Sequence, residues 1–166
     1  MISGCGPSTE ELEDVASMGK TQKNAAVNAE VVEMVVAPVQ MVWLRTLKIE
    51  SWPGWNAAIE ATTAPEEMKE GATFSWTADG SKRDAKIVVI RPGKLFAWID
   101  ETTMTKSIVV FKLDYVDAER TILQISRSLD GPFVSLFTDK EEQQACLQNW
   151  VASIRTSLND TKVEQE

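Results

Sequence analysis

The strongest hydrophobic pattern of the chain lies between residues 138 and 160, near its C-terminal end. Thr138 and Glu141 predict a capping box at the start of a helix there. At about 1.5 Å per residue this helix is roughly 30 Å long. An apolar stripe of that length needs an equally long apolar surface to cover it. The stripe consists of five residues at helical spacing, namely Leu147, Trp150, Val151, Ile154 and Leu158.

Alternating apolar and polar positions in the middle of the chain predict strands that supply this surface. The segment 107–116 alternates most clearly, and one of its faces carries Val109, Phe111, Leu113 and Tyr115. Turn signals such as Asp79-Gly80 separate the segments. Short strands joined by tight turns predict an antiparallel meander, with strands over 72–77, 85–91, 95–101, 107–116 and 121–129.

Two more strands and two short helices are predicted before the meander. Residues 29–37 alternate, with Val32, Met34 and Val36 expected on the buried face. Helical spacing follows over 39–49, after Pro38. An aromatic turn from Trp52 to Asn56 leads into a second short helical turn, and its two tryptophans are either a lid or, as we favour, an aromatic plug that only orients the turn. Residues 57–63 read as a weak strand. The fold class is therefore α+β, with about seven strands, two small helices after the first strand and one long helix at the end.

Composition narrows the functional classes. The chain has 166 residues, a net charge of −8, an isoelectric point near 4.7 and no dense cluster of lysine or arginine. Nucleic acid and anionic membrane surfaces are therefore poor partners. The sequence contains no histidine, which removes serine–histidine triads, imidazole bases and the commonest transition-metal ligand. We predict no metal site and no cofactor.

Only two cysteines occur, Cys5 and Cys146, so a disulfide framework is not predicted. Cys146 lies on the long helix one turn before Trp150. We expect it to be a small buried residue, because the helix itself offers no cation or base to activate a nucleophilic thiolate.

Three regions differ in composition. Residues 1–26 predict a flexible tail or tether, in which residues 8–18 form a frayed or loosely docked short helix. Residues 27–160 form the domain, and 161–166 a disordered tail. No apolar run has the length of a membrane span, which favours a cytoplasmic protein. The alternative is a membrane-anchored bacterial lipoprotein, because Ile2-Ser3-Gly4-Cys5 resembles a lipobox. Anchoring through Cys5 requires a signal segment upstream of Met1.

The order of elements resembles the START-like helix-grip superfamily, also called SRPBCC, and the motifs are most similar to its polyketide cyclase/dehydrase branch. The resemblance spans about residues 29–159. It implies a curved antiparallel sheet wrapped around the C-terminal helix, with an apolar cavity between them. Members include lipid and hormone binders and aromatic cyclases, and no catalytic motif carries over. The motifs are Ala37-Pro38 with Val42-Trp43, Trp52-Pro53-Gly54-Trp55-Asn56, residues 71–76 with Asp79-Gly80, residues 95–98, Thr121, Ser128-Leu129-Asp130-Gly131 and residues 147–150.

Candidate ligand-binding residues follow from the inward faces. Large aromatic side chains there offer apolar area and stack on flat ligands, and the competing interpretation is that they only fill the core. Arg127 shares a face with Leu123 and Ile125, so it is expected to point inward and to pair with a carboxylate such as Asp100 or to anchor a ligand. The predicted cavity lining comprises Phe74, Trp76, Trp98, Asp100, Phe111, Tyr115, Arg127 and Trp150.

Three functions remain open at this point. The favoured one is a protein that holds an apolar or aromatic small molecule in the cavity. The second is an enzyme of the cyclase or dehydratase kind, with Asp100, Tyr115 or Arg127 handling protons or polarising a carbonyl. The third is a protein-interaction domain whose cavity has collapsed. No catalytic residue is assigned.

Overall fold

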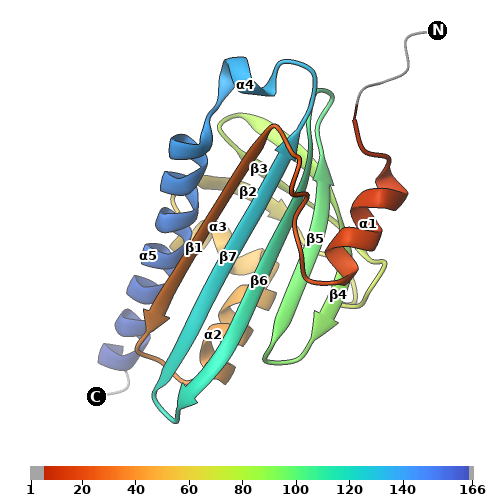
Figure 1. The fold of residues 1–166 in the computed structure, drawn as a ribbon. Coiled ribbons are helices and arrows are strands. Elements are labelled where there is room, and N and C mark those ends of the chain that lie inside the picture. The colour runs from red at the N-terminus through yellow and green to blue at the C-terminus, as the bar shows by residue number, and fades with distance from the viewer. Residues whose placement is uncertain (1–5, 165–166) are drawn as a thin grey trace, which may run out of the picture.

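The computed structural model describes the backbone of residues 6–164 and the side chains of residues 6–159. One curled antiparallel sheet has the strand order β1-β7-β6-β5-β4-β3-β2, and α5 (Lys140–Glu164) lies against its inner face (Figure 1). The predicted α+β helix-grip architecture is confirmed. The seven strands are β1 (Val27–Val35), β2 (Ile59–Thr63), β3 (Thr73–Ala78), β4 (Ser81–Arg91), β5 (Leu95–Glu101), β6 (Lys106–Asp117) and β7 (Arg120–Asp130).

The first strand buries the opposite face from the one predicted. Val31 and Val35 point into the core, and Glu33 forms an ion pair with Arg155 of α5 at 2.7 Å. Apolar residues occupy both odd and even positions here, so alternation alone does not decide which set is buried. Packing against α5 decides it, and the residues predicted to be buried are exposed: Val32, Met34 and Val36.

Helix α5 carries the predicted apolar stripe, and all five residues of the stripe are buried. Its cap lies one residue later than predicted, because the carboxylate of Asp139 accepts the backbone N–H of Glu142 at 2.9 Å. A carboxylate suits this position through both hydrogen bonding and the helix dipole. The helix runs to Glu164, past the predicted end at 160, and residues 161–164 contain no glycine or proline to stop it. None of the described helices is long and apolar enough to cross a membrane.

Short helices close the two ends of the core. Between β1 and β2 lie α2 (Val39–Leu47), the 3-10 helix η1 (Ile49–Ser51) and α3 (Trp52–Trp55), as the sequence predicts in outline. A further turn, α4 (Val134–Phe137), joins β7 to α5 at the other end (Figure 1). Gly131 precedes α4 and packs so closely on the carbonyl of Met104 that a side chain there would collide with it.

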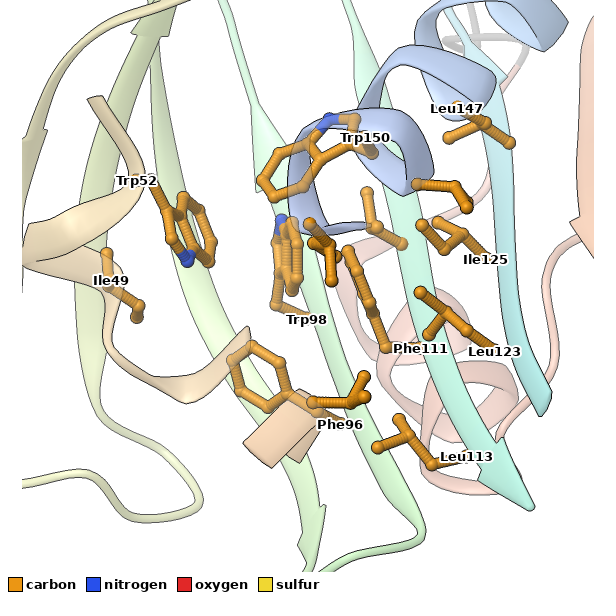
Figure 2. Close-up of a cluster of buried hydrophobic side chains, with 14 of the residues drawn as sticks. Ile49, Trp52, Phe96, Trp98, Phe111, Leu113, Leu123, Ile125, Leu147 and Trp150 are labelled. Carbon is orange, nitrogen blue, oxygen red and sulfur yellow. The ribbon is translucent and has the colours of Figure 1, made fainter. Parts of the chain in front are cut away.

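The core between the sheet and α5 is largely aromatic. Trp52 is fully buried, and its indole N–H donates to the carbonyl of Thr46 at 3.0 Å. Its ring centroid lies 5.0 Å from that of Trp150 on α5 and 5.5 Å from that of Trp98 on β5 (Figure 2). Phe111 stacks on the far side, 5.6 Å from Trp98. Edge-to-face and stacked pairs of this kind add to the hydrophobic effect of burial.

A helix also covers the outer face of the sheet. Residues 9–17 form α1 (Thr9–Ser17), which begins with the predicted capping box of Ser8 and Glu11. Leu12 and Ala16 are buried against strands β4, β5 and β6, and Lys86 pairs with Glu13 at 2.7 Å. The structure thus differs from the flexible tail predicted for 1–26, because the outer sheet face is itself apolar and offers a docking surface. Residues 1–5, with Cys5, lie outside the described residues.

The aromatic core makes Trp150 a structural anchor. We expect Trp150→Ala to lower the free energy of unfolding by about 3 to 5 kcal/mol, the usual range for truncating a core aromatic residue. Gln148→Ala is the control, since Gln148 is exposed on the same helix. Urea melts measure both. A loss below about 1 kcal/mol for Trp150→Ala would mean that α5 does not hold the sheet in this way.

The outer helix is testable in the same manner. Leu12 is 1% exposed, so Leu12→Ala should cost about 2 to 5 kcal/mol. Asp14→Ala, at an exposed position of the same helix, serves as the control. Equal unfolding midpoints for wild type, Leu12→Ala and a chain lacking residues 1–20 would show that α1 does not dock.

Candidate functional site

The inner face of the sheet changes from aromatic to polar at the end near α4. The change occurs along one row that crosses four adjacent strands: Arg83 on β4, Asp100 on β5, Ser107 on β6 and Arg127 on β7. The strand register makes them neighbours, since Asp100 pairs with Ser107 and Arg127 pairs with the next inward residue of β6, Val109. On β4 the partner of Asp100 is Ala85, and Arg83 is the next residue on the same face. We call Arg83, Asp100, Ser107 and Arg127 the polar row.

Asp100 is the buried anion of the polar row and is 1% exposed. Its carboxylate accepts the indole N–H of Trp98 at 2.9 Å and the hydroxyl of Ser107 at 3.1 Å. The nearest guanidinium nitrogen of Arg127 lies 4.0 Å away. Two short hydrogen bonds and one longer ionic contact therefore share this charge, which offsets much of the cost of burying it.

Arg127 points inward, as the sequence predicts, and joins the two walls of the site. It is 8% exposed. Its Nε–H donates to the hydroxyl of Ser107 at 3.3 Å, and its Nη1 donates to the amide oxygen of Gln143 on α5 at 3.0 Å. Gln143 is held in turn, because its amide nitrogen donates to the hydroxyl of Thr138 at 3.1 Å. The cation thus has two neutral partners and shares one anion.

Arg83 is the second cation and is half-buried. Its Nη1 donates to the backbone carbonyls of Ala78 and Ser81, both at 3.2 Å. Its guanidinium carbon lies 4.6 Å from the ring centroid of Trp76, and that of Arg127 lies 5.9 Å from the same ring. Burial lowers the pKa of Arg83, the charge of Arg127 lowers that pKa further, and the charge of Asp100 offsets part of the decrease.

A pocket of about 260 Å³ opens above the polar row, between α5, α4 and the sheet. Both arginines line it, with Leu129 and Phe137 as its main apolar walls. Cys146 also lines this upper pocket and is exposed, so the prediction of a small buried residue is wrong. The reason is its place on α5: the buried stripe begins one residue later, at Leu147.

The predicted aromatic lining fills the core instead of bordering an open space. Ring centroids 5 to 7 Å apart connect these side chains to one another and to Trp52, as Figure 2 shows for several of them. Phe74 alone also borders a shallow surface pocket. The residues that pack in this way are Phe74, Trp76, Trp98, Phe111 and Trp150.

Tyr115 is placed away from the other candidates. It is 68% exposed, because β6 continues past the start of β5 and its last residues reach beyond the core. It lines a second, lower pocket of about 910 Å³ beside α2, together with Trp43 and Leu44. The charged groups of that pocket, such as Arg91 and Asp114, are exposed. The predicted grouping of Tyr115 with Asp100 and Arg127 is therefore wrong.

The inward position of Arg83 could also have been predicted from the sequence. The hairpin signal at Asp79-Gly80 implies that a strand resumes at Ser81, and alternation then puts Arg83 on the same face as Ala85 and Ile87. Among the described residues, no group of three or more acidic, cysteine or histidine side chains is placed to hold a metal ion.

Comparison with known proteins places the fold. No family model and no curated sequence match the chain. Solved structures do: a START superfamily protein from Mycobacterium smegmatis has a TM-score of 0.68 at 10% identity, over 81% of this chain and 98% of that one. The Zhui aromatase/cyclase from Streptomyces sp. R1128 has a TM-score of 0.62 at 16% identity, over 84% and 95%.

A third structure comes from the dynemicin biosynthetic locus. DynU16 has a TM-score of 0.65 at 21% identity, over 80% of this chain and 47% of its own. Identities this low establish the fold and nothing finer. The chain therefore has the START-like helix-grip fold, as its sequence motifs predict.

The polar row leads to a prediction on stability. Arg127→Met should lower the free energy of unfolding by about 1 to 3 kcal/mol, because Asp100 loses its cation while it keeps two hydrogen bonds. Arg155→Met is the control. Its ion pair is shorter but 40% exposed, so the expected cost is about 1 kcal/mol or less. Urea melts of Arg127→Met, Asp100→Asn and the double variant complete the cycle, and purely additive losses would contradict the pairing.

Proposed function

We propose that this chain is a small-molecule binding protein whose ligand occupies the upper pocket, between α5 and the polar row. The observation that carries the proposal is the position of Arg127, a nearly buried cation that borders a pocket and bridges both of its walls. Burying a cation is costly, and a ligand that uses it recovers part of that cost.

The START-like fold supports this location. The upper pocket lies where the helix and the sheet separate, so a ligand there contacts both layers. Its volume of about 260 Å³ lies just below the usual range of about 300 to 1,000 Å³ for ligand sites and suits a compact molecule. The walls are mostly polar or charged, and the apolar surfaces of Leu129 and Phe137 provide contact area for an apolar body. We therefore propose a ligand with an apolar or aromatic body.

Binding is favoured over catalysis by the arrangement of the candidate acid–base groups. Asp100 is buried beneath the pocket and is engaged by Trp98 and Ser107, and Tyr115 lies at the opposite end of β6. General acid–base catalysis needs its groups within hydrogen-bond reach of one substrate. The pocket itself presents two guanidinium groups and the amide of Gln143, which can hold and orient a ligand, while its carboxylates, Asp79 and Glu142, are exposed at the rim.

The proposal is tested by blocking the pocket. Gln143→Trp should fill it, whereas Gln148→Trp adds the same volume on an exposed part of α5. Native mass spectrometry of the purified proteins should find a co-purified small molecule on wild type and Gln148→Trp, and less than about a tenth of that occupancy on Gln143→Trp. Equal ligand occupancy in Gln143→Trp and Gln148→Trp would show that the ligand does not bind in the upper pocket. A wild type without any bound molecule would favour the collapsed interaction domain.

A further inference from the structure

The upper pocket contains more positive than negative charge at its base. Arg127 and Asp100 balance each other, and Arg83 remains as a second cation. Among residues 6–159, no carboxylate lies within 4.0 Å of the guanidinium of Arg83, although Asp79 and Glu142 line the same pocket. Those two carboxylates are exposed and hydrated at the rim. Arg83 thus has no carboxylate in direct contact, and only longer-range attraction to Asp100 and Asp79 offsets its charge.

The hydrogen bonds of the site also indicate that it can accept an anion. The described bonds of Arg83 use only Nη1, which leaves Nε–H and Nη2 without an acceptor among the described residues. Nη2 of Arg127 has only the 4.0 Å contact to Asp100. The indole N–H of Trp76, whose ring both guanidinium groups approach, is buried without a partner. Among the described residues, these donors therefore have no hydrogen-bond acceptor of their own.

We propose that Arg83 and Arg127 together bind an oxyanion carried by the ligand, a carboxylate or a phosphate on an apolar or aromatic body. This inference rests on the proposed function and names its ligand class. An oxyanion between the two guanidinium groups accepts from both forks and compensates the extra charge. It also relieves the repulsion between the two cations, which approach the same ring. That repulsion adds to the effect of burial in lowering the pKa of Arg83.

Cys146 provides a direct probe, since it is exposed at this pocket. In a Cys5→Ser background it is the only thiol. We compare the rates at which Cys146 is alkylated by iodoacetate, an anion, and by iodoacetamide, its neutral analogue. The iodoacetate rate divided by the iodoacetamide rate cancels differences in thiolate content and in access. We expect the ratio in the folded protein to exceed that in urea at least threefold, and Arg83→Gln to remove most of the increase. Arg120→Gln, which removes the same charge at the far end of β7, should leave it unchanged.

Ligand class is then tested with three probes of similar shape: 1-naphthoate, 1-naphthyl phosphate and 1-naphthamide. The two anions should protect Cys146 from iodoacetamide, and their relative protection identifies which oxyanion the site prefers. Arg83→Gln should weaken both anions about tenfold and leave the amide unaffected. Arg83→Lys, which keeps the charge and loses the fork, should recover only part of the affinity. Urea melts establish that each variant is folded.

The outcomes separate this inference from the proposed function. Equal protection by all three probes, with an unchanged alkylation ratio in Arg83→Gln, would overturn the oxyanion site and keep the binding function. An alkylation ratio that is raised in the wild type and falls in Arg83→Gln supports the oxyanion site, even when no naphthyl probe protects Cys146. In that case the naphthyl group of the probes does not fit the pocket. A ratio equal to that of the unfolded chain overturns the inference.

Discussion

The indole of Trp52 lies where three parts of the protein meet, and its burial holds them in register. The ring comes from the short helices between β1 and β2, packs against Trp98 on the sheet and Trp150 on α5, and is anchored by its own N–H to Thr46. This ring is nearly perpendicular to that of Trp150 and tilted against that of Trp98, and close packing of such large rings leaves them little freedom to slide. The sheet, the short helices and α5 therefore form one packed unit (Figure 2).

This rigid core determines where polar groups can be placed. Below the polar row, the inner face is apolar, and Trp98 and Phe111 are fully buried there, so a polar group would find no solvent and few hydrogen-bond partners. At the α4 end the same face meets solvent through the upper pocket, and there Arg83, Asp100 and Arg127 are tolerated. Their hydrogen bonds come from the sheet and from α5 alike, so the pocket is held by the same two layers that form the core.

The helices and strands could be predicted well from the sequence, whereas the buried face of a strand could be predicted less well. Strong periodicity gave α5 and the meander, whereas β1 has apolar residues on both faces, and only packing against α5 distinguishes Val31 from Val32. Arg127 was placed inward because its neighbours alternate cleanly. Tyr115 obeys the same alternation, yet it lies past the end of the core, and periodicity contains no information on where a partner strand stops. Arg83 lay outside the predicted strand, so its contribution to the pocket was not predicted.

The strand order also has a consequence for how the chain folds. Strands β2 to β7 each pair with their neighbour in sequence, so hairpins can form them locally and quickly. β1 pairs with β7 instead, joining Val27 to Leu129 across most of the domain. During synthesis β1 leaves the ribosome first and waits for its partner, with apolar side chains on both faces. Until β7 emerges, β1 has no partner strand to cover its apolar side chains, and an unpaired apolar strand is open to aggregation.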